Sequence, residues 1–299
     1  MRKKGKIEIE EAKLENKKYW IWLSMLMEVG NISKKKLLDK YKTPERIYNL
    51  TYEELIQLKW LNNKKIENIL DKKIRECLGE YIENMIRKEI DTITINERLY
   101  PKRLKEIYDA PVCIYIKGNK NILNKNMIGI IGCRQASEYG IKAAKYFSYN
   151  LSKKGIIIVS GLAKGIDSFS HIGTIEANGK TIAVVGNSLD IVYPKENYYL
   201  EKQIIQKEGA IISEYPLGVK PEKINFPARN RIISGISKGV IVVEAKRKSG
   251  TLITVDFALE QGRDVYVVPG NINSINSVGT NDLIKQGARL VTNYEEIEV

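Results

Sequence analysis

Seven short runs of Ile, Val and other apolar residues follow one another from Met127 to Thr292, and each is separated from the next by a polar or glycine-containing segment. The runs are MIGII, GIIIVSG, TIAVVG, AIISEYP, GVIVVEA, DVYVVPG and ARLVT. Near-continuous β-branched runs are typical of strands that are buried on both faces, and the helical stretches between them suit crossover connections. The pattern therefore predicts an α/β fold with a mostly parallel sheet and helices on both faces.

The part of the chain before this pattern is predicted to be helical. From about Lys17 to Ile90 apolar residues recur at helical spacing. Two segments, LMEVGNISKKKLLDKY and LIQLKWLNNKKIENIL, share a plan of helix, short polar turn and lysine-bearing helix, which resembles paired helix-hairpin-helix units. Asn62 and Asn63 occupy a turn where glycine would allow the closest approach of a phosphate, so DNA binding and plain packing both remain open for this region. We predict a helical domain over 1–90 and an α/β domain over 91–299.

The charge of the chain suits a partner that is rich in phosphate. The 299 residues hold 49 Lys and Arg against 36 Asp and Glu, a formal net charge of +13. The excess is spread along the sequence, so a basic tail is not expected, and a general lysine bias of the proteome is the alternative explanation.

The cysteines and the hydropathy pattern limit the kind of site and the location that we expect. Cys77, Cys113 and Cys133 offer neither a disulfide framework nor a paired metal-ligand motif, and the chain has a single histidine, so no metal is expected. No apolar run approaches the roughly 20 residues that span a bilayer. We expect a cytoplasmic protein without a membrane partner.

The loops after the apolar runs are where a parallel sheet binds ligands, and two of them have features of anion sites. After the first run, Gly132 permits a tight turn, Arg134 offers a fork of donors, and Ser137 can cap the next helix. After the second run, Gly161 and Gly165 bracket Lys164 and open a helix. An ordinary strand-to-helix turn is the alternative for the first loop, and neither loop has the pattern of a P-loop.

Acidic and histidine side chains in the second loop and its helix are expected to be structural. Asp167 is predicted to cap the helix rather than to act as a base. His171 has no paired nucleophile in the sequence, which favours packing or hydrogen bonding over catalysis.

Two further segments add cations and an aromatic ring. Lys246 and Lys248 precede a Ser-Gly-Thr helix start, although a solvated surface loop is an alternative for this segment. The segment FPARNRII places Phe226 beside two arginines near a helix start, a combination that can hold phosphate and stack an unpaired base. Arg231 of this segment is also a candidate for a structural ion pair with Glu244 or Glu214.

The motifs GIIGCRQAS, SGLAKGIDSFSH, AVVGNSLDIVYPKEN, SEYPLGVKPEKINFPARNRIISGIS, VVEAKRKSGTLITVDFALEQGRDVYVVPG and GTNDLIKQGA occur in this order. Together they resemble the DprA/Smf family of DNA-processing proteins from about Asp91 to Thr292. The helical region resembles the sterile-alpha-motif-like domain of that family only in size and helicity.

The resemblance implies an extended Rossmann-like fold and a homodimer that binds and shields single-stranded DNA. It also implies a role in loading RecA recombinase during DNA uptake, natural transformation and recombination, without catalysis or a cofactor. Carried over by motif, Arg134 would contact phosphate, and Lys164 and Lys195 would line a basic pocket. The resemblance implies a stacking wall of Phe226, Arg229 and Asn230, and a pocket shaped by Gly132, Gly161 and Gly165. The complete predicted DNA-binding set is Gly132, Arg134, Ser137, Gly161, Lys164, Gly165, Lys195, Phe226, Arg229, Asn230, Arg231, Lys246 and Lys248.

Three departures from the family pattern and two alternatives qualify this expectation. Cys133 replaces the usual Ser or Thr, Asn187-Ser188 replaces Thr-Gly, and the sequence ends at Val299, so a C-terminal winged-helix domain is not expected. A nucleotide-processing enzyme on a related fold is one alternative, but the Gly-Gly-x-Gly-Thr-x-x-Glu arrangement of such enzymes is absent. A nucleotide-binding sensor that uses the same phosphate loops is the other.

Overall fold

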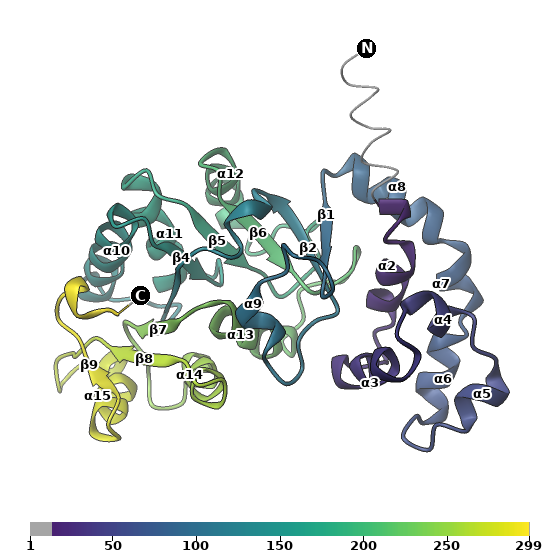
Figure 1. Cartoon of the computed structure of the whole chain (residues 1–299). Coiled ribbons are helices and arrows are strands. Elements are labelled where there is room, and N and C mark those ends of the chain that lie inside the picture. The colour runs from purple at the N-terminus through teal and green to yellow at the C-terminus, as the bar shows by residue number, and fades with distance from the viewer. Residues whose placement is uncertain (1–13, 299) are drawn as a thin grey trace, which may run out of the picture.

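The computed structural model describes residues 14–298, so the first 13 residues of the predicted helical domain, and Val299, lie outside the described residues. The described residues before Asp91 form only helices and turns, as the hydrophobic spacing predicted (Figure 1). The helices are α2 (Lys18–Met25), α3 (Asn31–Tyr41), α4 (Pro44–Tyr48), α5 (Tyr52–Ile56), α6 (Asn63–Ile69), α7 (Lys72–Glu76) and α8 (Leu78–Arg87). We refer to residues 14–90 as the helical segment; its standing as a separate domain stays a prediction.

Local sequence explains where these helices start. Thr51 and Glu54 form a reciprocal capping box at α5. The Asn62 side chain accepts a hydrogen bond from the backbone N–H of Lys65 and so caps α6. This capping role explains why asparagine occupies the turn where the hairpin pattern would favour glycine.

The described residues form one nine-stranded sheet in the order β1-β2-β6-β5-β4-β3-β7-β8-β9. The seven apolar runs form β3 to β9, which are all parallel, and β2 pairs antiparallel with both β1 and β6. The mostly parallel α/β fold is thus confirmed, with an antiparallel extension at one edge. The strands are β1 (Asp91–Thr94), β2 (Cys113–Gly118), β3 (Met127–Ile131), β4 (Ile157–Ser160), β5 (Thr181–Val184), β6 (Ala210–Ser213), β7 (Gly239–Val242), β8 (Asp264–Val267) and β9 (Arg289–Leu290).

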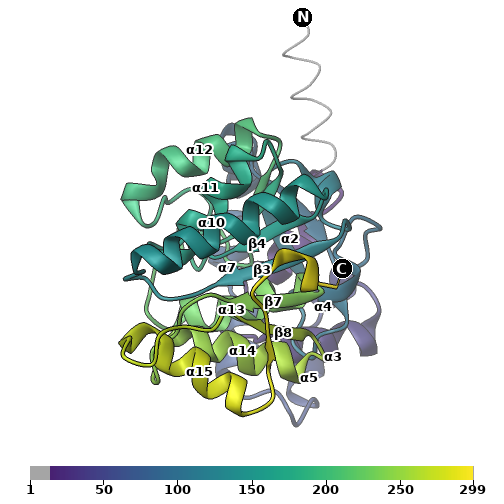
Figure 2. The ribbon, with the colours of Figure 1, turned by 90° about the vertical axis from the view of Figure 1, so that its left-hand side faces the viewer.

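Helices cover both faces of the sheet (Figure 2). Helices α10 and α11 pack on one face against side chains such as Ile130 and Ile158, while α13 and α14 pack on the other against Val159 and Val242. No helix within residues 14–298 is long and apolar enough to cross a membrane. The helices that follow β1 are α9 (Lys102–Lys105), α10 (Glu138–Lys153), α11 (Ile166–Glu176), α12 (Tyr198–Gln206), α13 (Asn225–Ile236), α14 (Gly250–Glu260) and α15 (Val278–Lys285).

The helical segment lies beside the β1–β2 edge of the sheet (Figure 1). Its buried side chains, including Trp22 and Leu37, belong to the same apolar cluster as Cys113 and Tyr115 of β2 and Ile211 of β6. Burial of apolar surface is the main stabilising contribution to folding, so a shared cluster attaches the helical segment firmly to this part of the sheet.

Candidate nucleic-acid interface

A groove of about 830 Å³ lies at the carboxyl ends of the central strands. Its lining comes from the loops after β3, β4, β5 and β7, from the segment before α13, from α13 itself and from the N-terminal half of α14. We call it the strand-end groove. Of the predicted DNA-binding residues, it brings together Gly132, Arg134, Phe226, Arg229, Asn230, Lys246 and Lys248.

A small slot of about 60 Å³ adjoins the groove and contains the aromatic wall. The ring of Tyr193 lies 5.4 Å from that of Phe226, measured between centroids, and the Arg134 guanidinium lies 5.4 Å from the centroid of the Phe226 ring. Gly186 allows this packing, because a Cβ there would lie 3.0 Å from the Phe226 ring. Arg134, Lys164 and Arg229 all line this slot, so the three side chains converge on one site.

Tyr193 is a groove residue that the sequence analysis missed. Tyr193 lies in the loop after β5, far along the chain from Phe226 on α13, and only the fold brings the two rings together. The available signal was an aromatic residue next to Pro194 and Lys195 in a loop after an apolar run. Lys223, Gln135 and Thr251 also line the groove without having been predicted.

Arg229 supports the groove through hydrogen bonds to two backbone carbonyl oxygens. Its side chain is buried, with the residue only 4% exposed, and Nη1 donates hydrogen bonds to the carbonyl oxygens of Gly161, at 2.7 Å, and Val184. Burial lowers the pKa of the guanidinium to about 10, and Asp167 opposes this shift. Arg229 also lines the groove and its slot, so its place in a stacking wall stays a prediction.

In the first of the predicted anion-site loops, the start of α10 is occupied by the protein's own carboxylate. Ser137 caps α10 as predicted, accepting a hydrogen bond from the N–H of Gly140 at 3.1 Å. The buried carboxylate of Glu244, which follows β7, accepts hydrogen bonds from the Ser137 N–H, at 3.0 Å, and from its hydroxyl. Gly140 leaves room for it, since a Cβ there would lie 2.4 Å from Glu244 Cδ. Ser137 does not line the strand-end groove, whereas Gly132 and Arg134 of the same loop do.

The second loop is held in a similar way by Asp167. Its Oδ2 accepts a hydrogen bond from the N–H of Ala163 at 3.4 Å, and Ala163 lies in the loop before α11. The predicted capping role is therefore wrong: Gly165 is the N-cap residue of α11, and Asp167 holds the loop that precedes the helix. Burial raises the pKa of this carboxyl group, and Arg229 opposes the shift. Gly165 has a φ of 78° and packs against the first loop, where a Cβ would lie 2.4 Å from the Cys133 carbonyl oxygen. Lys164 reaches the slot but forms an ion pair with Glu196 at 2.6 Å.

The loop after β7, which carries Lys246 and Lys248, also lines the groove. The first turn of the helix that follows, α14, contains no acidic residue. The Ser249 side chain caps α14 by accepting a hydrogen bond from the Thr251 N–H at 3.2 Å. Lys248 is exposed, and the Lys246 ammonium donates a hydrogen bond to Gln135 Oε1 at 3.3 Å. Backbone N–H groups and cations therefore face the groove together at the start of α14.

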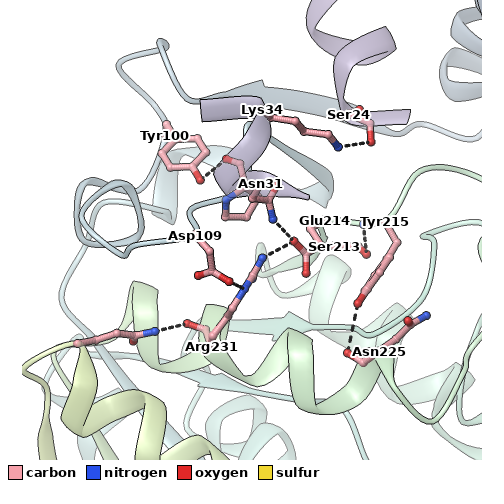
Figure 3. A network of polar contacts seen from close by, with 12 residues as sticks. Ser24, Asn31, Lys34, Tyr100, Asp109, Ser213, Glu214, Tyr215, Asn225 and Arg231 are labelled. Carbon is pink, nitrogen blue, oxygen red and sulfur yellow. Dashed lines mark hydrogen bonds and ion pairs between the residues drawn. The ribbon is translucent and has the colours of Figure 1, made fainter. Parts of the chain in front are cut away.

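Arg231 lies away from the groove. Its Nε donates to Asp109 Oδ2 at 2.7 Å and its Nη2 to Glu214 Oε2 at 2.6 Å, with a side chain only 6% exposed (Figure 3). The predicted alternative of a structural pair with Glu214 is confirmed, whereas the pair with Glu244 is wrong. Its place in the DNA-binding set is corrected, because both of its ion pairs are internal. Lys195 is exposed outside the groove lining.

His171 is a packing residue in the described chain. Thr181 donates its hydroxyl proton to the Ile158 carbonyl at 2.7 Å, so the contact of 2.7 Å between His171 Nδ1 and Thr181 Oγ1 requires Nδ1 to be the donor. Burial lowers the pKa of this imidazole to about 3, and Arg229 adds to the shift. The described residues contain no group of three or more His, Cys, Asp or Glu side chains that could hold a metal ion.

Comparisons with known proteins agree on one family. Residues 91–298 match the family model described as DNA recombination-mediator protein A. The DNA processing protein DprA of Streptococcus pneumoniae is 44% identical over 210 residues, which cover 70% of this chain and 74% of that protein. The DprA protein of Bacillus subtilis is 45% identical over 209 residues, 70% of each chain.

Two solved structures are similar over most of their length. The crystal structure of S. pneumoniae DprA aligns with a TM-score of 0.78 at 36% identity, covering 93% of this chain and 96% of that one. The DNA processing protein A of Helicobacter pylori aligns with a TM-score of 0.63 at 31% identity, covering 69% and 93%. The H. pylori protein has a single-stranded DNA binding mode that is described as unique.

Proposed function

Because the chain belongs to the family of DNA recombination-mediator protein A, the DprA/Smf proteins, we propose that its strand-end groove binds single-stranded DNA. The observation that supports this most is the stack of Arg134, Phe226 and Tyr193 beside the cations of the groove. An aromatic face next to an arginine suits an unpaired base and its phosphate, and it requires no particular sequence.

We assign some residues of the groove to the sugar-phosphate backbone of the DNA and others to its bases. Arg134, Lys223, Lys246 and Lys248 attract phosphates, and the N–H groups at the start of α14 add a short-range contact. Phe226 and Tyr193 offer their rings to bases. Arg229, Asp167 and Glu244 keep the loops in place by hydrogen bonds to the backbone or to loop side chains. Gly132 and Gly161 allow the loops to approach closely, since a Cβ on either would lie 2.5 Å from a neighbouring side-chain atom.

The proposal extends to the assembly in which the protein acts. We infer that the chain works as a homodimer in the cytoplasm, where it shields single-stranded DNA and passes it to RecA recombinase during DNA uptake and recombination. The description of its family as a recombination mediator supports this extension. We propose that the groove binds its strand without transforming it.

A titration against three kinds of ligand tests the proposal. Fluorescence anisotropy would follow binding of labelled oligothymidylates of increasing length, of a duplex and of a mononucleotide in competition. We expect affinity that rises with strand length and falls steeply with salt, because each phosphate contact releases counterions. Tight, salt-insensitive binding of the mononucleotide without gain for longer strands would instead favour a nucleotide sensor.

A further inference from the structure

One carboxylate joins the helical segment to the helix that forms a wall of the groove. Glu214 follows β6, and its Oε2 accepts hydrogen bonds from Arg231 Nη2 at 2.6 Å and from Asn31 Nδ2 at 3.2 Å (Figure 3). Asn31 is the first residue of α3 in the helical segment, and Arg231 lies on α13. Helix α13 also carries Phe226, Arg229 and Asn230, which line the groove.

The segment between Glu214 and α13 has a second anchor on the helical segment. The backbone N–H of Leu217 donates to the hydroxyl of Tyr81, on α8, at 2.7 Å. The next residue, Gly218, donates its N–H to Asp190, which is also 3.8 Å from the ammonium of Lys88. Pro221 and Lys223 of the groove lining lie in this same segment. Part of one groove wall is therefore held by side chains of the helical segment.

A buried lysine makes the docking of α3 depend further on Glu214. Lys34 is 5% exposed, and its ammonium donates a hydrogen bond to the Ser24 carbonyl at 3.1 Å. Burial lowers its pKa to about 8, and the negative charge of Glu214 opposes that shift. A buried cation needs a nearby counter-charge, so Glu214 has electrostatic partners on both α3 and α13.

We propose that Glu214 is a positioning residue that couples docking of the helical segment to the shape of the strand-end groove. Binding of single-stranded DNA and docking of the helical segment then stabilise each other. The effect is indirect, because Asn31 and Lys34 do not line the groove. Coupling of this kind is reciprocal. If docking of the helical segment strengthens DNA binding by a certain factor, DNA binding strengthens the docking by the same factor. The inference rests on the proposed function, since it names how that same groove is held.

Amide hydrogen exchange on the full-length wild-type protein tests the coupling directly. We expect an oligothymidylate to slow exchange in α3 and around residues 214–218, which lie outside the DNA contacts. Arg134→Ala serves as the control, because it removes a phosphate contact without touching this network, and its exchange in α3 should not respond at the same DNA concentration. Unchanged exchange of α3 in wild-type protein that has bound DNA would overturn the inference.

A matched pair of variants supplies the reciprocal measurement. Asn31→Ala removes the hydrogen bond to Glu214, whereas Asn68→Ala removes a comparable hydrogen bond within the helical segment, from the Glu28 N–H at 3.1 Å. We expect Asn31→Ala to weaken single-stranded DNA binding about five-fold, at the lower end of typical couplings between sites, and Asn68→Ala to leave it unchanged. Equal affinity of the two variants, both folded by circular dichroism, would contradict the coupling. If wild-type protein itself fails to bind single-stranded DNA, the proposed function fails instead.

Discussion

Arg229 donates a hydrogen bond from Nη1 to the carbonyl oxygen of Gly161 at 2.7 Å, which ties α13 to the loop after β4. The same nitrogen donates to the Val184 carbonyl, so a single buried guanidinium spans the ends of two neighbouring strands. Gly161 is required for this contact, because a Cβ there would lie 2.6 Å from Arg229 Nη1.

Replacement of Arg229 should therefore lower stability. Arg229→Ala leaves two buried carbonyl groups without their donor and removes the positive charge that opposes the raised pKa of Asp167. We expect it to lower the free energy of unfolding by about 3 to 5 kcal/mol. Urea denaturation followed by circular dichroism measures this. An unchanged urea midpoint would show that the carbonyl contacts contribute little.

Arg134 should behave in the opposite way. It is exposed, so Arg134→Ala is expected to leave the urea midpoint almost unchanged while weakening single-stranded DNA binding by more than about ten-fold through loss of a charge-assisted contact. The slope of log K against log salt concentration should become shallower by about 0.7 for each lost phosphate contact. A weaker affinity with the original slope would indicate that Arg134 acts through Phe226 rather than on a phosphate.

Phe226 should contribute to affinity without contributing to salt dependence. Phe226→Ala removes the ring between Arg134 and Tyr193, and loss of base stacking is expected to cost about 1 to 3 kcal/mol of binding free energy. Tyr199→Ala is the matched control, since Tyr199 is an exposed ring on α12, outside the groove. Equal losses in the two variants, measured by anisotropy at one salt concentration, would argue against stacking at Phe226.

His171 should make the fold sensitive to mild acid. Its pKa is about 3 in the folded protein and near 6.5 in the unfolded chain, so the unfolded state takes up the proton first as the pH falls. The contribution of neutral His171 to stability is fully present above pH 6.5. Below pH 6.5 the free energy of unfolding should fall by about 1.4 kcal/mol per pH unit. Since the chain has one histidine, His171→Asn should flatten this dependence between pH 6.5 and 5, measured by urea denaturation at each pH. A slope that persists in His171→Asn would assign it to carboxyl groups.

The sequence predicted the central strands because their pattern is local. Residues such as Ile128, Ile130 and Val240 are buried because helices cover both faces of the sheet. Continuous Ile/Val runs are typical of strands in that environment. The Ser137 cap was also predictable, since a cap lies within a few residues of the helix that it stabilises.

The groove was less predictable because its decisive contacts join distant segments. The carboxylate of Glu244 fills the start of α10, and no local pattern indicates which acidic residue will fold back onto a given helix start. The meeting of Tyr193 with Phe226 and the burial of Arg229 likewise depend on strand order. Glu214 could be named as a partner of Arg231 only as one of two alternatives, since both acidic residues follow strands.

The position of Glu244 has a consequence for the kind of ligand that this fold admits. Strand order diverges between β3 and β7, the place where open α/β sheets usually hold the phosphate of a compact cofactor against a helix start. Here the carboxyl group of Glu244 already occupies the helix start, so the terminal phosphate of a small molecule cannot bind at that position. A long strand of DNA does not depend on that position, because it can lie along the strand-end groove and contact the protein at several points along its length.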